Sequence, residues 1–215
     1  KSKVSIIEFT GDKIFKDKTL RNIITTEENK FWKFLSGKKF LNQQSLSLDE
    51  RLLRQFYLNN GYYDVSVNTS TATILDDDSF KLTYNINAGN LFIINSAKLD
   101  LPIDYNPVNF TKVQKLLNEL KGNKYSFNKI SKIVKEIDKI SLSREFDFIN
   151  ASILEERSDT NKININFKVT ESEKLYVERI NVFGNNITEE SVIRASLEVD
   201  EGDPFNELLH AKSLN

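Results

Sequence analysis

Residues 61–67 read Gly-Tyr-Tyr-Asp-Val-Ser-Val, and residues 147–153 read Asp-Phe-Ile-Asn-Ala-Ser-Ile. Each stretch follows a helical pattern and opens a run in which apolar and polar residues alternate, which is typical of a strand with one buried face. A second pair of similar stretches, residues 7–12 and 180–185, lies about twice as far apart. Recurrence at such a spacing predicts an array of small modules, and we expect such an array to bind and align partners.

The composition limits the class of protein. The 215 residues are 39% hydrophobic and 28% charged, which suits globular material with room for two small domains and a fragment of a third. The chain has no Cys, which excludes thiol catalysis, Cys-ligated zinc and disulfides. A net charge of −1 argues against a nucleic-acid binder, because such a protein needs a basic face. The apolar runs are too short to span a bilayer.

The helices of the first repeat are predicted from caps and from apolar spacing. Asp17 is expected to cap the first helix, and Ser47 with Glu50 reads as a capping box for the second. Gly61 is expected to end that second helix in the left-handed conformation. The residues expected to form its buried stripe are Leu48, Leu52 and Phe56.

The strands complete an order of strand, helix, helix, strand, strand. In the first repeat the alternation predicts strands over residues 4–9, 62–71 and 80–86. The middle repeat follows the same plan, with a helix starting at Asn106-Pro107 and a second helix capped by Ser126. Its strands are expected over residues 91–99, 149–153 and 163–169. The third repeat offers a strand over residues 176–183, a helix capped by Thr188 and a second helix from Pro204. The predicted domains are residues 1–89, 90–172 and a partial repeat over 173–215, so we expect this chain to be a piece of a longer protein.

Three motifs within this order resemble those of a known family. They are Phe-Trp-Lys-Phe at residues 31–34 with Lys-Lys-Phe at 38–40, the stretch 53–62, and the stretch 176–185. Together they resemble the polypeptide-transport-associated (POTRA) repeats of the BamA family of outer-membrane β-barrel assembly proteins, specifically the third repeat, the fourth and the start of the fifth. The middle repeat departs from the family pattern, because Asp147-Phe148 stands where Gly-Tyr is usual.

The resemblance implies an α+β fold of tandem β-α-α-β-β modules, each a three-stranded mixed sheet with two helices on one face. It also implies a periplasmic scaffold, chaperone-like and without a cofactor, in a bacterial outer-membrane protein that carries a C-terminal membrane barrel. Its implied partners are accessory lipoproteins of the β-propeller and tetratricopeptide-repeat types, together with unfolded outer-membrane protein precursors. A related alternative is the POTRA region of a two-partner secretion or organellar import barrel that recognises exported polypeptide.

The resemblance also implies two partner-binding surfaces. The second strand of each module is an edge in the resembled fold, and an exposed edge can recruit an extended peptide by β-augmentation. In the first repeat this edge strand would dock the β-propeller lipoprotein, and its named residues are Tyr62, Tyr63, Asp64, Val65, Ser66, Val67, Asn68 and Thr69. Arg194 and Glu201 stand where the family docks its tetratricopeptide-repeat lipoprotein. The alternative for both surfaces, an unoccupied edge and ordinary solvated charges, stays open.

An enzyme is the competing class, and few residues support it. The single His, His210, lies in the partial repeat, and neither a Gly-rich phosphate loop nor a Gly-flanked Ser nucleophile is present. Asp76, Asp77 and Asp78 lack the spacing of calcium ligands and favour a hairpin turn instead. The aromatic cluster at residues 31–34 favours the module's own core over a partner contact. We therefore expect neither catalysis nor a metal.

Overall fold

The computed structural model describes eight parts of the chain. The chain divides into two compact units. The described parts are residues 3–28, 43–75, 79–141, 149–171, 175–183, 189–197, 199–203 and 205. Unit 1 contains Lys1–Leu58, Asp64–Gly89 and Asn181–Ser196, and unit 2 contains Asn59–Tyr63, Asn90–Ile180 and Leu197–Asn215. The motifs at residues 31–34 and 38–40, the triplet at 76–78 and Asp147-Phe148 lie outside the described residues.

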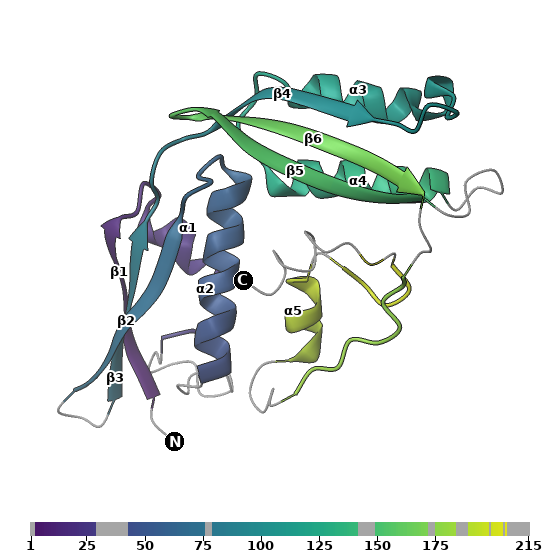
Figure 1. Ribbon diagram of the computed structural model, residues 1–215. Coiled ribbons are helices and arrows are strands. Elements are labelled where there is room, and N and C mark those ends of the chain that lie inside the picture. The colour runs from purple at the N-terminus through teal and green to yellow at the C-terminus, as the bar shows by residue number, and fades with distance from the viewer. Residues whose placement is uncertain are drawn as a thin grey trace. The chain divides into compact units, whose positions relative to one another are not determined.

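Unit 1 is built on a mixed three-stranded sheet with helices on one face (Figure 1). The strand order is β1-β3-β2, with β1 parallel to β3 and β2 antiparallel to it. This arrangement confirms the predicted α+β module. The elements are β1 (Lys3–Asp12), α1 (Asp17–Arg21), α2 (Gln43–Asn59), β2 (Ser66–Ile74) and β3 (Ser79–Asn87).

The helix starts predicted for unit 1 are wrong. Asp17 is the first residue inside α1, and the N-cap is Lys16, whose side chain makes no capping hydrogen bond. Ser47 lies inside α2, which already includes Gln43. The earlier start buries Leu46, which is 7% exposed. An extra helical turn that buries a leucine outweighs the weak preference of Ser for a cap, because packing of the apolar face contributes most of a helix's stability in a protein.

The buried stripe of α2 also differs from the expectation. Among Leu48, Leu52 and Phe56, only Leu48 is fully buried. The stripe that faces the sheet instead carries a carboxylate among its apolar members, and it consists of Leu46, Asp49, Leu53 and Tyr57. Its members follow the three- and four-residue spacing of one helical face. The expected stripe was wrong because an acidic residue was not counted as a core position.

Asp49 is fully buried, and hydrogen bonds from two other elements surround its carboxylate. Its Oδ1 accepts from the Thr25 main-chain N–H at 2.6 Å and from the Thr25 hydroxyl at 2.8 Å. Its Oδ2 accepts from the Tyr84 hydroxyl of β3 at 2.6 Å. Burial, followed by the charge of Asp49, raises the pKa of Tyr84. The carboxylate therefore ties α2 to both the sheet and the segment after α1.

Unit 2 repeats the same architecture. Its sheet has the order β4-β6-β5, with β4 parallel and β5 antiparallel to β6, and α3 and α4 lie on one face of that sheet (Figure 1). The elements are β4 (Ile93–Asp100), the 3-10 turn η2 (Pro107–Phe110), α3 (Thr111–Leu120), α4 (Phe127–Ser141), β5 (Ile149–Asp159) and β6 (Lys162–Glu171).

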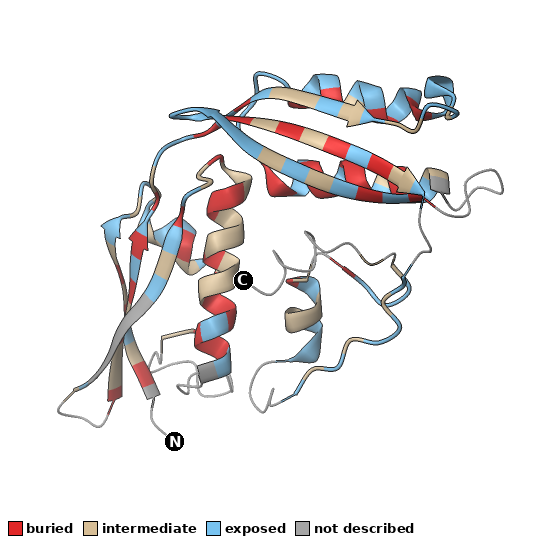
Figure 2. Cartoon of the chain, in the orientation of Figure 1, coloured by how far each residue is buried: buried red, intermediate tan, exposed pale blue. Residues whose placement is uncertain are grey.

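The sequence patterns of unit 2 are confirmed more fully. Asn106 accepts a hydrogen bond from the Val108 N–H at 3.0 Å, and Pro107 opens the 3-10 turn that leads into α3. Buried and exposed residues alternate along β6 (Figure 2). The apolar residues that repeat along one face of α4 and of β6 are all buried, and they are Ile130, Ile133, Val134, Ile137, Ile163, Ile165, Phe167 and Val169. Strong apolar alternation along the strands and regular apolar spacing along α4 explain why the sequence predicted this unit more fully.

The segment after β6 contains one short helix among its described residues. The helix is α5 (Glu190–Ala195), whose N-cap is Glu189. The strand predicted over residues 176–183 is wrong, since only Tyr176 forms an isolated bridge. The main chain of Val177 pairs with a turn instead: its N–H donates to the Asp203 carbonyl at 2.9 Å, and its carbonyl accepts from the Gly202 N–H at 2.7 Å. Phe205 is not helical, and Thr188 and Pro204 lie outside the described residues.

We predict that Asp49→Ala lowers the free energy of unfolding of unit 1 by roughly 2–4 kcal/mol, because the Thr25 N–H and hydroxyl, the Thr26 N–H and the Tyr84 hydroxyl all lose their acceptor. Tyr84→Phe, which removes one donor and leaves the bonds from Thr25 and Thr26 in place, should cost about 1 kcal/mol. Asp12→Ala, a change at an exposed carboxylate, is the control and should stay within about 0.5 kcal/mol. Urea denaturation followed by circular dichroism measures all three. An Asp49→Ala chain as stable as Asp12→Ala would contradict the account.

Candidate partner-binding strand edges

A three-stranded sheet has two outer strands, and each presents main-chain N–H and C=O groups without a strand partner. The outer strands are β1 and β2 in unit 1, and β4 and β5 in unit 2. The prediction that the second strand of each module is an edge is therefore confirmed for β2 and β5. Whether an edge can accept another strand depends on whether its outward groups already have partners.

The outward residues of β1 follow from the hydrogen bonding between β1 and β3. Alternate residues of a parallel strand face its neighbour. The Ala88 N–H donates to the Asp12 carbonyl at 3.0 Å, so Asp12 faces the β3 side. The residues that alternate with it, Ile7, Phe9 and Gly11, therefore direct their main-chain groups away from β3.

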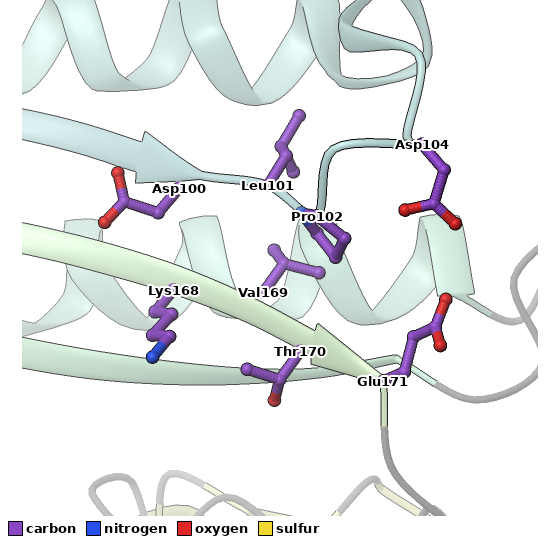
Figure 3. A pocket seen from close by; sticks show the side chains of 8 residues that line it. All are labelled: Asp100, Leu101, Pro102, Asp104, Lys168, Val169, Thr170 and Glu171. Atoms are coloured by element: carbon purple, nitrogen blue, oxygen red, sulfur yellow. The ribbon is translucent and has the colours of Figure 1, made fainter.

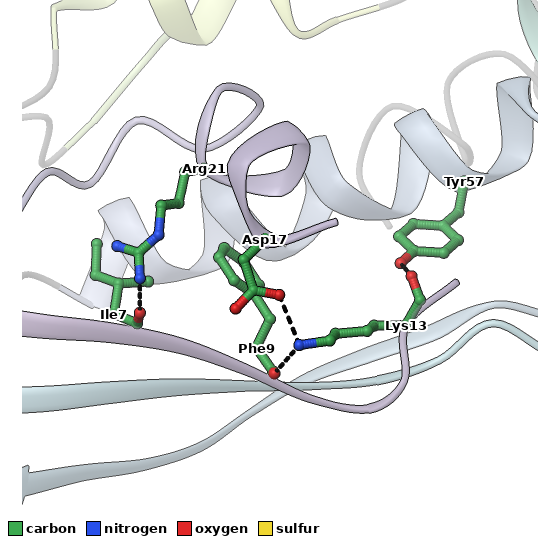
Figure 4. Close-up of polar contacts among 6 residues, drawn as sticks. All are labelled: Ile7, Phe9, Lys13, Asp17, Arg21 and Tyr57. Atoms are coloured by element: carbon green, nitrogen blue, oxygen red, sulfur yellow. Dashed lines mark hydrogen bonds and ion pairs between the residues drawn. The ribbon is translucent and has the colours of Figure 1, made fainter. Parts of the chain in front are cut away.

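Two charged side chains occupy both outward groups of Ile7, and Figure 4 shows the one from Arg21. The Ile7 N–H donates to Glu28 Oε1 at 2.9 Å. Arg21 Nη2, at the end of α1, donates to the Ile7 carbonyl, and Arg21 Nη1 pairs with the same Glu28 oxygen. A guanidinium and a carboxylate together thus reproduce the donor and the acceptor that a neighbouring strand would offer at this position.

Lys13 occupies the next outward carbonyls of β1. Its Nζ donates to the Phe9 carbonyl at 2.9 Å and forms an ion pair with Asp17 at 2.6 Å (Figure 4). The main-chain N–H of Lys13 donates to the Gly11 carbonyl at 3.1 Å. Groups of the same module therefore occupy both outward groups of Ile7 and the outward carbonyls of Phe9 and Gly11.

Main chain closes the start of the β4 edge in unit 2. The Ile94 carbonyl accepts from the Gly122 N–H at 2.8 Å, and the Ile94 N–H donates to the Asn123 carbonyl at 2.9 Å. The Tyr125 N–H donates to the Phe92 carbonyl at 2.9 Å. The loop between α3 and α4 therefore acts as a short additional strand along this edge, which is a different way of closing the first strand of a module.

Among the residues that the structure describes, strand β2 has no comparable cover. The Leu75 N–H donates to the Ser79 carbonyl at 2.8 Å, so this opposed pair is hydrogen-bonded, and the alternation along β3 determines the rest. The residues of β2 that turn their main-chain groups outward are Val67, Thr69, Ala72 and Ile74. Within the described part of the chain, no hydrogen bond beyond the sheet reaches the main chain of Ser66–Ile74. A bulge between Thr69 and Thr71 divides this edge into two short stretches.

The start of the predicted edge needs correction, because β2 begins at Ser66 and not near Tyr62. The ring of Tyr63 packs inside unit 2 against Phe92 at 5.6 Å and Tyr125 at 4.9 Å. The Tyr63 hydroxyl donates to Glu155 at 3.0 Å. These contacts hold the residues before Ser66 out of the strand. Of the predicted edge residues, Tyr62, Tyr63, Asp64 and Val65 thus precede the strand, while Ser66, Val67, Asn68 and Thr69 form its first half.

The second edge, β5, carries more charge than β2. Glu155, Glu156, Arg157 and Asp159 lie along its second half. Leu154, just before them, is 54% exposed, and Glu155 accepts hydrogen bonds from Tyr63 and Tyr125. Charged side chains on an outer strand disfavour pairing with another strand. The β2 edge is therefore the more accessible one for an extended peptide.

The other two predicted residues, Arg194 and Glu201, are each engaged close to their own position. Arg194 on α5 pairs with Glu190 one turn earlier, with Nε and Nη2 each 2.7 Å from the same carboxylate oxygen. Glu201 Oε1 accepts from the Ile180 main-chain N–H at 3.0 Å. Arg194 belongs to unit 1, and Glu201 belongs to unit 2.

A surface hollow of about 360 Å³ lies at the ends of β4 and β6 (Figure 3). Its lining residues are Asp100, Leu101, Pro102, Asp104, Lys168, Val169, Thr170 and Glu171. Asp100 Oδ2 accepts from the Asn166 side-chain amide at 2.6 Å, and Glu171 Oε1 accepts from the Tyr105 hydroxyl at 3.1 Å. The hollow was not predicted from the sequence, and two of its carboxylates already have partners within the module.

The described residues also limit other kinds of site. They contain no group of three or more His, Cys, Asp or Glu that could hold a metal ion. Among the same residues, no helix has the length and apolar character to cross a membrane.

Comparison with known proteins gives a matching family model, similar proteins and solved structures with a similar fold. The family model described as "Surface antigen variable number repeat" (POTRA) matches residues 2–89 and 175–215. The outer membrane protein assembly factor BamA of Neisseria meningitidis serogroup B is 25% identical over 206 residues, which are 95% of this chain and 26% of that protein. The factor of the same name from Buchnera aphidicola is 27% identical over 212 residues, or 95% of this chain and 33% of that protein. The chain thus spans between a quarter and a third of these relatives.

Solved structures share the fold. The crystal structure of Haemophilus influenzae BamA POTRA3-5 has a TM-score of 0.59 at 20% identity, and the match covers 99% of this chain and 83% of that one. The structure of BamA from Haemophilus ducreyi lacking POTRA domains 1-3 has a TM-score of 0.54 at 15% identity, covering 82% of this chain and 29% of that one.

Proposed function

The chain belongs to the POTRA family of surface antigen variable number repeats, and from that premise we propose that it is a periplasmic scaffold which binds extended polypeptide along the β2 edge. It works in the assembly of outer-membrane proteins, as the names of its relatives indicate. Its role is binding without chemistry. The division into repeats over residues 1–89, 90–172 and 173–215 belongs to the same proposal.

One observation carries the proposal: β2 is an outer strand whose main-chain groups remain available among the described residues, while the opposite edge of the same sheet is closed. A free strand edge provides alternating donors and acceptors, which an extended peptide can match. Main-chain pairing depends little on the identity of side chains. An edge of this kind therefore suits unfolded outer-membrane protein precursors, which share alternating strands and differ in sequence.

The exposed polar residues of β2 suit an edge that must stay soluble when empty. Ser66 and Asn68 are exposed and turn away from the helices, while Val67 on the other face is half-buried. An alternating peptide could thus continue both faces of the sheet, with its apolar side chains beside Val67. A loop of the β-propeller lipoprotein could pair in the same way, and we propose it as the second occupant of this edge.

The test is an amide chemical-shift titration of the full chain with a peptide copied from one amphipathic strand of an outer-membrane protein. We expect shifts concentrated in Ser66–Ile74, and similar shifts with a peptide whose residues are shuffled but whose alternation is kept. Val67→Pro should weaken binding about 10-fold or more, because it removes an outward donor without removing a bond to β3.

The matched control for that variant is Val67→Thr, which keeps the main-chain N–H and nearly the same shape. It should bind the peptide as the unaltered chain does. Equal binding by both variants, or shifts that avoid Ser66–Ile74 altogether, would contradict recognition through the main chain of β2.

We further propose that Arg194 and Glu201 help to dock a tetratricopeptide-repeat lipoprotein. Each side chain is exposed at least in part, and each charge, within its own unit, would orient an oppositely charged partner and raise its association rate more than its affinity. The local bond from the Ile180 N–H to Glu201 fixes where that carboxylate is presented.

Two substitutions at Glu201 separate its charge from its local hydrogen bond. Glu201→Lys in the full-length protein should reduce co-purification of that lipoprotein several-fold, because the charge is reversed. Glu201→Gln keeps an acceptor for Ile180 and removes only the charge, so it should have a smaller effect, mainly on the association rate at low salt. Glu178→Lys, at another exposed carboxylate, is the control. Unchanged association of the Glu201→Lys protein would rule out this docking surface.

A further inference from the structure

The two outer strands of unit 1 differ in a way that bears on where a partner can bind. Both strands belong to one short sheet, and each would offer a row of donors and acceptors if it were bare. On β1 the outward groups of Ile7 and the outward carbonyl of Phe9 are bonded to charged side chains. On β2 no described group outside the sheet has that role.

We propose that Arg21, Glu28 and Lys13 act as a guard that closes the β1 edge to strand addition and so directs an extended peptide to β2. The inference rests on the proposed function, since it decides which edge of the module the peptide uses. These three side chains form the edge guard.

The geometry of the edge guard matches what a competing strand would need. A strand pairing with β1 at Ile7 must donate to its carbonyl and accept from its N–H. Arg21 already donates to that carbonyl (Figure 4), and Glu28 already accepts from that N–H. The pairing strand would then have to displace a bond to a charged group, which is stronger than a bond between neutral groups. The ion pair between Arg21 and Glu28 also holds these two side chains to each other, which makes both harder to displace.

The surroundings favour a stable guard over a pair of freely moving side chains. Arg21 has 36% of its side chain exposed and Glu28 has 22%, so both are largely removed from water. Arg21 is anchored at the end of α1, and Lys13 is anchored through Asp17 in the first turn of the same helix. A single short helix therefore positions two of the three guard residues.

The chemistry of the third residue fits the same role. Lys13 donates to the Phe9 carbonyl from the side where a further strand would run. A lysine on an outer strand also opposes pairing because an incoming strand must bury or move its charge. The guard thus acts by occupying hydrogen-bonding groups and by placing charge where a strand would lie.

The test opens the β1 edge and asks whether a strand then binds there. In the double variant Arg21→Ala with Glu28→Ala, titrated with the amphipathic strand peptide described above, we expect new amide shifts at Ile7 and Phe9 in addition to those of β2. The unaltered chain should show shifts along β2 only. The apparent affinity of the β1 edge should rise at least about 10-fold over the unaltered chain.

The matched control is Lys81→Ala. Lys81 forms an ion pair with Glu8 at 2.8 Å, and its side chain is 36% exposed, as Arg21 is, but the pair occupies no outward main-chain group of β1. This control should bind peptide as the unaltered chain does. If the double variant does not fold, Arg21→Ala alone frees the Ile7 carbonyl, and it should show a smaller set of shifts at Ile7 and Phe9.

The outcomes for the guard and for the proposed function are separable. A folded variant without shifts at Ile7 and Phe9 overturns the edge guard, whatever happens at β2. Shifts at β1 in the variant, with no shifts at β2 in either chain, support the guard and reject β2 as the peptide site. Shifts at β1 in the Lys81→Ala control would also overturn the guard, because the effect would then follow from any lost ion pair.

Discussion

The constraint on which this structure depends is that the outward main-chain groups of a small sheet either take partners from their own module or stay available to another strand. Two of the three strands in such a sheet are outer strands, so strand edges form a large share of the module's surface. In unit 1, side chains close one edge through Ile7 and Phe9, and in unit 2 a loop closes the corresponding edge through Ile94. Two modules with the same fold thus close the same edge by different chemistry.

The helices in unit 1 serve both the core and the edge. Helix α2 buries an apolar stripe together with Asp49, whose carboxylate fixes the segment that follows α1. That segment carries Glu28, and α1 carries Arg21, so the buried carboxylate supports the part of the chain from which the edge is closed. Packing and edge protection are therefore connected through the same short stretch, and binding is left to the strand on the other side of the sheet.

The sequence predicted most of the architecture, because alternation along the strands and the spacing within α4 report directly on burial. It did not predict the position of Asp49, since a buried carboxylate resembles a surface residue until its hydrogen-bond partners are known. It also placed the start of β2 too early. Tyr63 alternates correctly with its neighbours, but its ring packs against Phe92 and Tyr125, residues far along the chain. The sequence also did not predict the contacts of Arg21 and Glu28 with Ile7, because these residues lie 14 and 21 positions from Ile7 and form no local motif.

The central claim is that the first strand of each module is closed at its outer edge while β2 is open, and amide hydrogen exchange of the full chain tests it most directly. The account predicts that the Ile7 and Ile94 amides exchange slowly, because each donates to an acceptor, at 2.9 Å in both cases. The Val67 and Ile74 amides should exchange at rates close to those of exposed groups. Equal protection of all four amides, or rapid exchange at Ile7, would contradict the claim.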